Sequence, residues 1–299
     1  MSKVGVIDIG TNTVLCLKAE VGSDAIDIIF DSRFHYRAGR RLDDLGNISA
    51  EYKTGMRRAL ILALETLKDC SEVKIVATEV LRKPKDGATF AGQLSDEVGY
   101  QIEIIEPQRE AELSFFGAIS GFDTISGKVA VLDVGGGSSE LAIGEDGALQ
   151  RWSGVRIGAV SLSEAVGYEK PLDDYLIHAD RIFADSDFSS LLDSKVTQLI
   201  LVGGSAVTIA GILNDMQIFD ADKLSGFEIR QDILSLLMEN LSIMTMDKRK
   251  QIIAFDPQRA EIIVPGGAII KAFMNKYGFD SVKISTKGLR HGLLLELFG

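Results

Sequence analysis

Two segments of this chain carry the same pattern of residues 125 positions apart. VGVIDIGTNTVLCLK begins at Val4, and VAVLDVGGGSSELAI begins at Val129. In each segment an apolar, β-branched run leads through Asp to a turn rich in glycine and hydroxyl residues, and a second apolar run follows. Two apolar runs joined by such a turn predict a β-hairpin. The repeat therefore predicts two domains of similar topology, each beginning with a hairpin.

Strands and helices alternate in the rest of the chain. Short β-branched runs predict strands at 73–77, 101–105 and 197–202, and apolar residues at helical spacing predict helices at 49–68, 109–119, 206–213 and 231–246. Residues 167–187 are polar and show no regular pattern that we could assign. This alternation favours an α/β fold with mixed sheets. A length of 299 residues is enough for about two domains, each with its own core.

The charge balance limits the kind of partner. The chain holds 32 Lys and Arg against 43 Asp and Glu, a formal net charge of −11, so a generally basic nucleic-acid binder is not expected. A polyanionic substrate would need a local basic patch or a metal ion. Seven basic residues are candidates for such a patch, with a solvated charged surface as the alternative: Arg33, Arg37, Arg40, Arg41, Arg82, Lys83 and Lys85.

Several common sites have no support in this sequence. Cys16 and Cys70 are far apart and belong to no metal-binding pattern, so neither a disulfide framework nor a structural zinc site is expected. The three histidines are scattered, and no GxxxxGK[ST], HExxH or GxSxG motif occurs. No apolar run reaches about 18 residues. We therefore expect a cytoplasmic protein without a membrane span.

The two glycine-rich turns are candidate phosphate-binding loops. Glycine lets the backbone approach an anion closely, and successive N–H groups can form an anion-binding nest. A single turn of this kind is usually only a turn, but two matched copies favour binding. The candidate residues are Gly10, Thr11, Asn12 and Thr13 in the first turn, and Gly135, Gly136, Gly137, Ser138 and Ser139 in the second.

Four acidic residues are candidates for catalysis or metal binding. Asp8 and Asp133 end the strands before the two turns, and Glu140 follows the second turn, where a solvated strand residue is the alternative. A carboxylate beside phosphate is repelled unless a cation intervenes, so these residues favour a metal site or the positioning of water. Glu110 lies early in a predicted helix, where a surface role is the alternative.

The motifs resemble those of a known superfamily. The two turns, together with LVGGSAVTIAG, are similar to the phosphate-1, phosphate-2 and adenosine motifs of the acetate kinase, sugar kinase, Hsp70 and actin superfamily. The third motif places Gly203, Gly204 and Ser205 in an adenosine-motif loop. More narrowly, VATEVLR, PQREAELSFFGAI, FDPQRAEIIVPGGAII and GLRHGLL resemble, in order, blocks of the exopolyphosphatase/guanosine pentaphosphate phosphohydrolase (Ppx/GppA) family, in a short two-domain form.

The resemblance implies a fold of two actin-like (ribonuclease H-like) domains, with mixed sheets flanked by helices and a cleft between the domains. We expect domain I at 1–121 with 286–299 and domain II at 122–285. The resemblance also implies Glu110 as the catalytic base and Arg82 as a phosphate ligand. Mg²⁺ or another divalent cation would lie with Asp133, Glu140 and Asp8, and K⁺ is a candidate second cation.

The implied reaction is hydrolysis of a terminal phosphoanhydride, by in-line attack of a water that the glutamate activates. Inorganic polyphosphate is the first expected substrate and guanosine pentaphosphate the second, and a homodimer is a candidate assembly. A kinase of the same fold that uses ATP and a non-catalytic sensor of polyphosphate or nucleotide are the alternatives. The chain departs from the family pattern at six positions that bear on substrate preference: Arg40, Arg41, Asp86, Arg109, Glu261 and His291.

Overall fold

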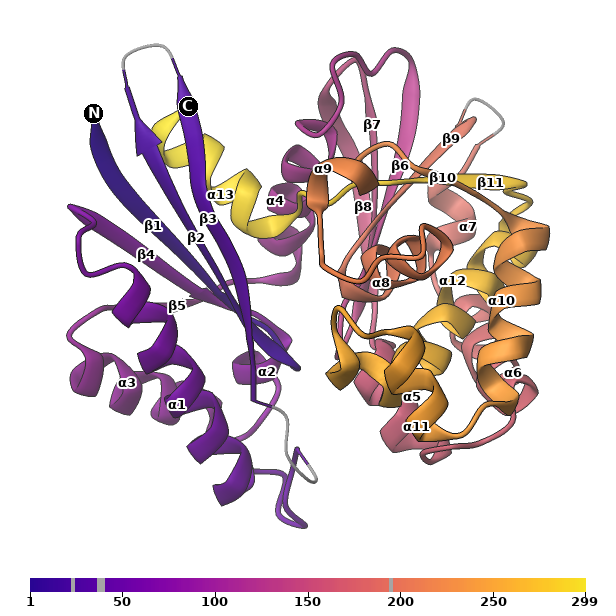
Figure 1. Ribbon diagram of the computed structural model, residues 1–299, viewed down its shortest axis with the longest axis horizontal. Coiled ribbons are helices and arrows are strands. Elements are labelled where there is room, and N and C mark those ends of the chain that lie inside the picture. Colours follow the sequence, from indigo (N-terminus) through magenta and orange to yellow (C-terminus); the bar gives the residue numbers. More distant parts are fainter. Residues whose placement is uncertain (23–24, 37–40, 194–195) are drawn as a thin grey trace. The chain divides into compact units, whose positions relative to one another are not determined.

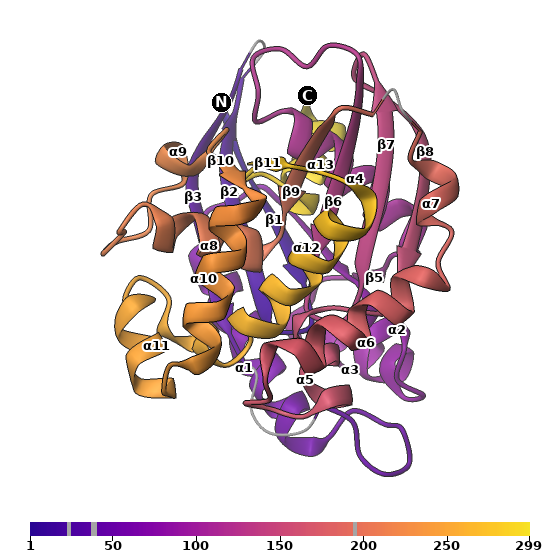
Figure 2. The same cartoon turned by 90° about the vertical axis from the view of Figure 1, so that its right-hand side faces the viewer.

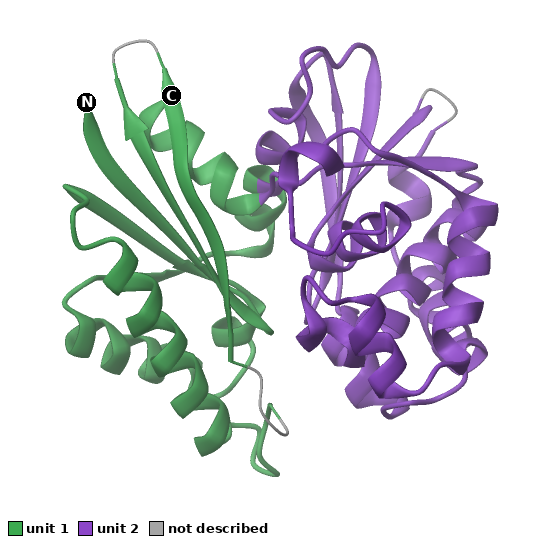
Figure 3. Cartoon of the chain, viewed as in Figure 1, with its two compact units in different colours: residues 1–113, 289–299 green, residues 114–288 purple. Residues whose placement is uncertain are grey.

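A computed structural model describes residues 1–22, 25–36, 41–193 and 196–299, and these form two compact units. Unit 1 consists of Met1–Leu113 with Leu289–Gly299, and unit 2 is Ser114–Gly288 (Figure 3). The chain thus passes between the units at 113/114 and 288/289, where the sequence suggested 121/122 and 285/286. Helix α4 (Pro107–Ile119) accounts for the first difference, because one continuous helix begins in unit 1 and ends in unit 2.

Unit 1 is built on a five-stranded mixed sheet in the order β3-β2-β1-β4-β5 (Figure 1). Its strands are β1 (Ser2–Ile9), β2 (Thr13–Val21), β3 (Ile26–His35), β4 (Glu72–Ala77) and β5 (Ile102–Ile104). β1, β2 and β3 pair antiparallel, whereas β4 lies parallel to β1, and β5 lies parallel to β4. The predicted first hairpin is confirmed as β1 and β2.

Both faces of this sheet are apolar, because alternate residues of β1 point to opposite faces. Ile7 and Ile9 belong to the core on the side of α1, whereas Val4 and Val6 pack with residues of α13. Asp8 alternates with Ile7 and Ile9 and so belongs to the α13 face. The helices of unit 1 besides the start of α4 are α1 (Ala50–Thr66), α2 (Glu79–Arg82), α3 (Gly87–Val98) and α13 (Leu289–Phe298).

Unit 2 contains a six-stranded mixed sheet in the order β10-β11-β9-β6-β7-β8 (Figure 2). Its strands are β6 (Lys128–Val134), β7 (Ser139–Glu145), β8 (Ala148–Val155), β9 (Gln198–Val202), β10 (Glu228–Arg230) and β11 (Ser281–Ile284). The helices are α5 (Ala159–Val166), α6 (Leu172–Ala184), α7 (Phe188–Leu191), α8 (Gly204–Leu213), α9 (Ala221–Leu224), α10 (Gln231–Ile243), α11 (Met246–Ile252), the 3-10 helix η1 (Pro257–Glu261) and α12 (Ile263–Tyr277).

The two sheets share one topology. From β8 to β11, unit 2 repeats the order and directions of the five strands of unit 1, and β10 is an added antiparallel edge. Asp8 pairs with Val76 on its parallel neighbour, and Asp133 pairs with Val202 on the equivalent strand. The sequence repeat is therefore a repeat of structure, and the predicted α/β fold with mixed sheets flanked by helices is confirmed.

Two helical segments differ from the sequence expectation. Residues 172–184, which looked irregular, form helix α6, whose buried residues Leu172, Tyr175, Ala179 and Phe183 follow helical spacing. The helix expected at 231–246 ends at Ile243, because Thr245 caps a new helix, α11, by accepting a hydrogen bond from the Lys248 amide. Among the described residues, no helix has the length and apolar character needed to span a bilayer. Both cysteines are free.

Candidate functional site

The two glycine-rich loops close with the same hydrogen bond. The Gly10 amide donates to the Thr13 carbonyl at 3.0 Å, and the Gly135 amide donates to the Ser138 carbonyl at 3.0 Å. These residues occupy equivalent positions of the repeat. The loops therefore share a backbone turn as well as a sequence pattern, and each lies where the first hairpin of its unit reverses.

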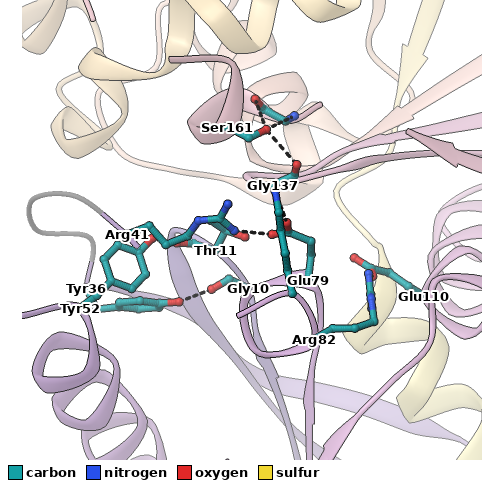
Figure 4. Close-up of polar contacts among 12 residues, drawn as sticks. Gly10, Thr11, Tyr36, Arg41, Tyr52, Glu79, Arg82, Glu110, Gly137 and Ser161 are labelled. Atoms are coloured by element: carbon teal, nitrogen blue, oxygen red, sulfur yellow. Dashed lines mark hydrogen bonds and ion pairs between the residues drawn. The ribbon is translucent and has the colours of Figure 1, made fainter. Parts of the chain in front are cut away.

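In unit 2, the carbonyl groups of the loop are held by the start of helix α5. The amides of Ala159 and Val160 donate to the carbonyls of Gly135 and Gly136, at 3.0 and 2.8 Å. The Ser161 hydroxyl donates to the Gly137 carbonyl at 2.9 Å (Figure 4). In a trans peptide the carbonyl and the following N–H point in opposite directions. The N–H groups of Gly136, Gly137 and Ser138 are therefore directed away from α5.

In unit 1, two tyrosines hold the equivalent carbonyls. The Tyr36 hydroxyl donates to the Gly10 carbonyl, and the Tyr52 hydroxyl donates to the Thr11 carbonyl (Figure 4). The Tyr36 amide also donates to the Asn12 carbonyl, at 3.4 Å. By the same peptide geometry, the N–H groups of Thr11 and Asn12 point away from the tyrosines. Each loop thus presents consecutive N–H groups on one side, which is the arrangement of an anion-binding nest.

Two of the predicted metal ligands lie together on the sheet of unit 2. Asp133 and Glu140 are directly paired across β6 and β7, so their side chains share one face of the sheet. Glu140 is only 3% exposed. The Asp133 carboxylate accepts a hydrogen bond from the Ser114 hydroxyl at 2.6 Å. Two neighbouring carboxylates on one face repel each other, and a cation would relieve that repulsion.

The donor set fits a magnesium ion that keeps part of its water shell. Mg²⁺ usually takes one or two carboxylates and completes its coordination with water and substrate phosphates. The described residues include no group of three or more His, Cys, Asp or Glu side chains able to hold a metal. Asp133 and Glu140, which pair across β6 and β7, would supply these two carboxylates. Asp8, the third predicted ligand, is buried in unit 1.

Glu110 and Arg82, predicted separately, lie together in unit 1. The Arg82 Nη2 atom is 3.1 Å from Glu110 Oε2, and Arg82 Nη1 donates to the Ile105 carbonyl at 2.5 Å (Figure 4). Glu110 is 8% exposed, in the first turn of α4. A neighbouring arginine stabilises the charged form of a carboxylate, which is the form that can take a proton from water. The surface role considered for Glu110 is thus wrong, because the side chain is buried and paired.

Sequence reasoning missed a further buried acid in this unit, besides Asp8 and Glu110. Glu79 begins helix α2 and forms an ion pair with Arg41 at 2.6 Å, and both side chains are buried (Figure 4). The Lys83 ammonium is 3.6 Å from the same carboxylate. Glu79 lies three residues before Arg82, in the same short helix. The signal available in the sequence was VATEVLR, where an acid comes two residues after the end of an apolar, β-branched run.

The adenosine-motif loop is tightly packed in unit 2. Gly203 has a φ of 96°, which favours glycine, and a Cβ there would lie 2.5 Å from the Val134 carbonyl oxygen. A Cβ on Gly204 would overlap the guanidinium of Arg259, a side chain that is itself buried. Ser205 is buried against Gly266 of α12. All three predicted residues therefore lie where β9 leads into α8.

The candidate basic residues do not share one environment in the described part of the chain, and the positions that depart from the family pattern lie in several different elements. Arg41 and Lys83 share Glu79, whereas Arg37 and Arg40 lie outside the described residues. Asp86 accepts a hydrogen bond from the Ile48 amide and pairs with Lys53 at 2.6 Å. His291 is buried in α13, with Nε2 3.5 Å from the Asp31 carboxylate. Glu261 ends η1. Asp86 and His291 thus have partners inside unit 1.

Known proteins resemble the chain over almost all of its length. A bifunctional 3-dehydroquinate synthase/phosphatase of Fusobacterium nucleatum is 28% identical over 97% of this chain, which spans only 46% of that protein. Exopolyphosphatase 2 of Mycobacterium tuberculosis is 26% identical over 100% of this chain and 99% of its own. Among solved structures, the PPX-GPPA enzyme of Aquifex aeolicus superposes with a TM-score of 0.80 at 22% identity, covering 99% of both chains.

The similarity to the solved structure supports the fold, and the match to a family model identifies the family. The description of the matching family is Ppx/GppA phosphatase, and the match extends over residues 17–299. The match begins inside β2 and does not include the first loop. The hydrogen bonds that shape the Gly10 loop therefore support a phosphate-binding loop independently of the family match. With nearly the whole chain matched, this protein belongs to the Ppx/GppA phosphatase family, a family of phosphohydrolases.

Proposed function

We propose that this chain releases orthophosphate from the end of a phosphoanhydride chain, with inorganic polyphosphate as the preferred substrate and guanosine pentaphosphate as the second. The observation that carries this proposal is the pair of equivalent loops, each with its carbonyls held back and consecutive N–H groups on the opposite side. N–H groups in this arrangement bind phosphate oxygens. The relative named an exopolyphosphatase, similar over the full length, supports polyphosphate as the substrate class.

Glu110 is the proposed general base. Its carboxylate takes a proton from water as the water oxygen bonds to the terminal phosphorus. The bond from that phosphorus to the bridging oxygen breaks, and the shortened chain leaves with the electron pair. Arg82, which contacts Glu110 in the structure, is proposed to neutralise charge on the phosphate oxygens. Water is sufficient as the acceptor, so no hydroxyl substrate is required.

Asp133 and Glu140 are the proposed ligands of a divalent cation. A bound Mg²⁺ would offset negative charge on the phosphate oxygens as it develops. Ser114, which lies one helical turn after Glu110 on α4, keeps the Asp133 carboxylate in place by its hydrogen bond. Asp8 holds the equivalent strand position in unit 1 and is proposed to position a water or a hydrated cation.

A phosphate-release assay separates the candidate functions. The purified chain is given short polyphosphate, long polyphosphate, guanosine pentaphosphate and ATP, each with and without Mg²⁺. We expect orthophosphate from polyphosphate, without any added acceptor, and only when the metal is present. ADP formation that depends on an added alcohol or carboxylate would favour the kinase. Binding of polyphosphate without turnover would favour the sensor, and faster release from guanosine pentaphosphate would reverse the order of substrates.

A further inference from the structure

We propose that Tyr36 and Tyr52 are positioning residues of the first phosphate-binding loop. By holding the carbonyls of Gly10 and Thr11, their hydroxyls keep the N–H groups of Thr11 and Asn12 directed toward the bound phosphate. This inference rests on the proposed function, because it assigns the loop a phosphate to bind. Neither tyrosine lies in a motif singled out by sequence, and neither is needed to close the hairpin, which the Gly10–Thr13 bond already does.

The two tyrosine rings are buried and pack against each other next to the loop. Tyr36 is 6% exposed and Tyr52 is fully buried, and their ring centroids lie 5.3 Å apart in an edge-to-face contact (Figure 4). Ser49 caps helix α1 by accepting a hydrogen bond from the Tyr52 amide, so Tyr52 occupies the first turn of a capped helix. Burial raises the pKa of Tyr36 well above its ordinary value, so that hydroxyl remains a donor at neutral and alkaline pH.

The equivalent loop of unit 2 can be compared with the first loop to test whether the tyrosines serve to orient its peptides. There the equivalent carbonyls of Gly135 and Gly136 receive backbone N–H groups from the start of α5, and Gly137 receives the Ser161 hydroxyl. In unit 1, hydroxyls donate to the carbonyls of Gly10 and Thr11. Two unrelated sets of donors thus hold the same carbonyls at equivalent positions of the repeat. Their shared effect, the orientation of the loop peptides, is therefore the feature that both units preserve.

The orientation matters because a peptide has opposite charge on its two sides. If the Gly10–Thr11 peptide turned over, a carbonyl oxygen would replace the Thr11 N–H on the side that faces an anion. Attraction of phosphate would then become repulsion. The glycine at position 10 makes such rotation easier than at most residues. A hydroxyl that donates to the carbonyl opposes the rotation, since a buried carbonyl without a donor costs free energy.

The test uses Tyr36→Phe and Tyr52→Phe, each of which removes one hydroxyl and keeps the ring. Tyr175→Phe is the matched control, because the buried Tyr175 also donates to a backbone carbonyl, that of Gly167, at the end of α5 opposite to the one that contacts the second loop. Two quantities are measured in the intact protein. One is the KM and kcat for orthophosphate release from polyphosphate. The other is the calorimetric affinity for bismethylene triphosphate, an analogue that cannot be hydrolysed. Thermal unfolding reports stability.

We expect each loop variant to raise KM, and the dissociation constant of the analogue, about 5- to 10-fold. The kcat should stay within about twofold, because the loop holds phosphate equally in the ground and transition states. Tyr175→Phe should leave both binding quantities unchanged while lowering the unfolding temperature comparably. Loop variants that match Tyr175→Phe in KM and in analogue affinity would overturn the inference.

Failure of the proposed function has a different signature. A wild-type chain that binds the analogue but releases no orthophosphate would reject hydrolysis, and the analogue titration would still decide the role of the tyrosines. A wild-type chain that does not bind the analogue would reject both.

Discussion

Glu110 is buried and has a cationic partner, Arg82. Its contribution to catalysis can be separated from any contribution to substrate binding. Glu110→Gln keeps the shape and removes the proton acceptor, so kcat should fall about 10²- to 10⁴-fold while substrate affinity changes little. Glu112→Gln is the control, since Glu112 lies on the same helix but is more exposed and contacts Gln108 and Arg109. A Glu110→Gln enzyme that retains more than about half of the wild-type kcat would remove this residue as the base.

The pairing of Asp133 and Glu140 in unit 2 predicts how activity depends on the metal concentration. Asp133→Asn and Glu140→Gln each remove one formal charge, so the Mg²⁺ concentration for half-maximal activity should rise by about an order of magnitude. Glu145→Gln, farther along the same strand, should leave the metal titration unchanged. Superimposable titration curves for all three variants and the wild type would leave Asp133 and Glu140 with a water-positioning role only.

The surroundings of Asp31 predict how the stability of the protein depends on pH. Burial acts to raise the pKa of this carboxyl, but Arg290 at 2.7 Å and His291 hold it well below its usual value. A depressed folded-state pKa contributes stability above the unfolded pKa of about 4, and that stability is lost as pH falls. Asp31→Asn should therefore cost about 2 kcal/mol at neutral pH.

The stability difference between wild type and Asp31→Asn should shrink below about pH 4. Denaturant unfolding across pH 3–7 measures it. The comparison variant is Asp69→Asn, whose exposed carboxylate also contacts two cations, Lys3 and Lys18, and which should change stability less. Equal effects of the two variants at every pH would contradict the role of burial.

At the scale of elements, helix α5 can approach the second loop only because Gly158 precedes it. A Cβ at that position would lie 2.5 Å from the Gly136 carbonyl carbon and 2.6 Å from the Gly137 nitrogen. Gly158→Ala should displace α5 from the loop carbonyls, destabilise the fold by about 1–3 kcal/mol and weaken phosphate binding.

The matched substitution is Gly92→Ala in helix α3, where an added Cβ meets nothing within 4 Å. It should stabilise the protein slightly, because alanine is a better helix former than glycine. Chemical denaturation and analogue titration of both variants give the comparison. Unchanged affinity in Gly158→Ala would mean that α5 does not set the geometry of the loop.

The sequence predicts the elements whose signal is local. Both hairpins were predictable, because the apolar runs and the glycine turn lie within fifteen residues of each other. Helix α6 was missed although Tyr175, Ala179 and Phe183 follow its buried face, since charged residues interrupt the apolar ones and polar residues flank the helix on both sides. The tyrosine contacts were beyond reach for another reason. Tyr36 and Tyr52 reach the first loop across 26 and 41 residues, and only the folded sheet and helix α1 bring them there.

At the scale of the whole molecule, unit 1 is assembled from two distant parts of the chain. Leu289, Leu293 and Leu294 of α13 pack against apolar residues of β1 and β2, including Val4, Val6 and Leu17. Removal of residues 289–299 should expose that face and destabilise unit 1 selectively. Hydrogen exchange should then accelerate in β1 and β2, while β6 and β9 of unit 2 keep their protection.

Leu293→Ala gives a milder version of the same test, with an expected cost of about 2–4 kcal/mol from loss of a buried side chain. Leu297→Ala on the same helix, at a more exposed position, should cost much less. Exchange in β1 and β2 that remains as slow in the truncated chain as in the intact one would show that α13 is dispensable for unit 1.

Helix α13 also sets an order of events during synthesis. Domains usually fold one after another from the N-terminus as the ribosome releases them. Here every residue of unit 2 is made before α13. Unit 2 can therefore complete its core while one face of the sheet in unit 1 still lacks the helix that covers it. During that interval Val4, Val6 and Leu17 offer an open apolar surface. We therefore expect the first strands of the nascent chain to remain open to solvent until α13 is made and completes unit 1.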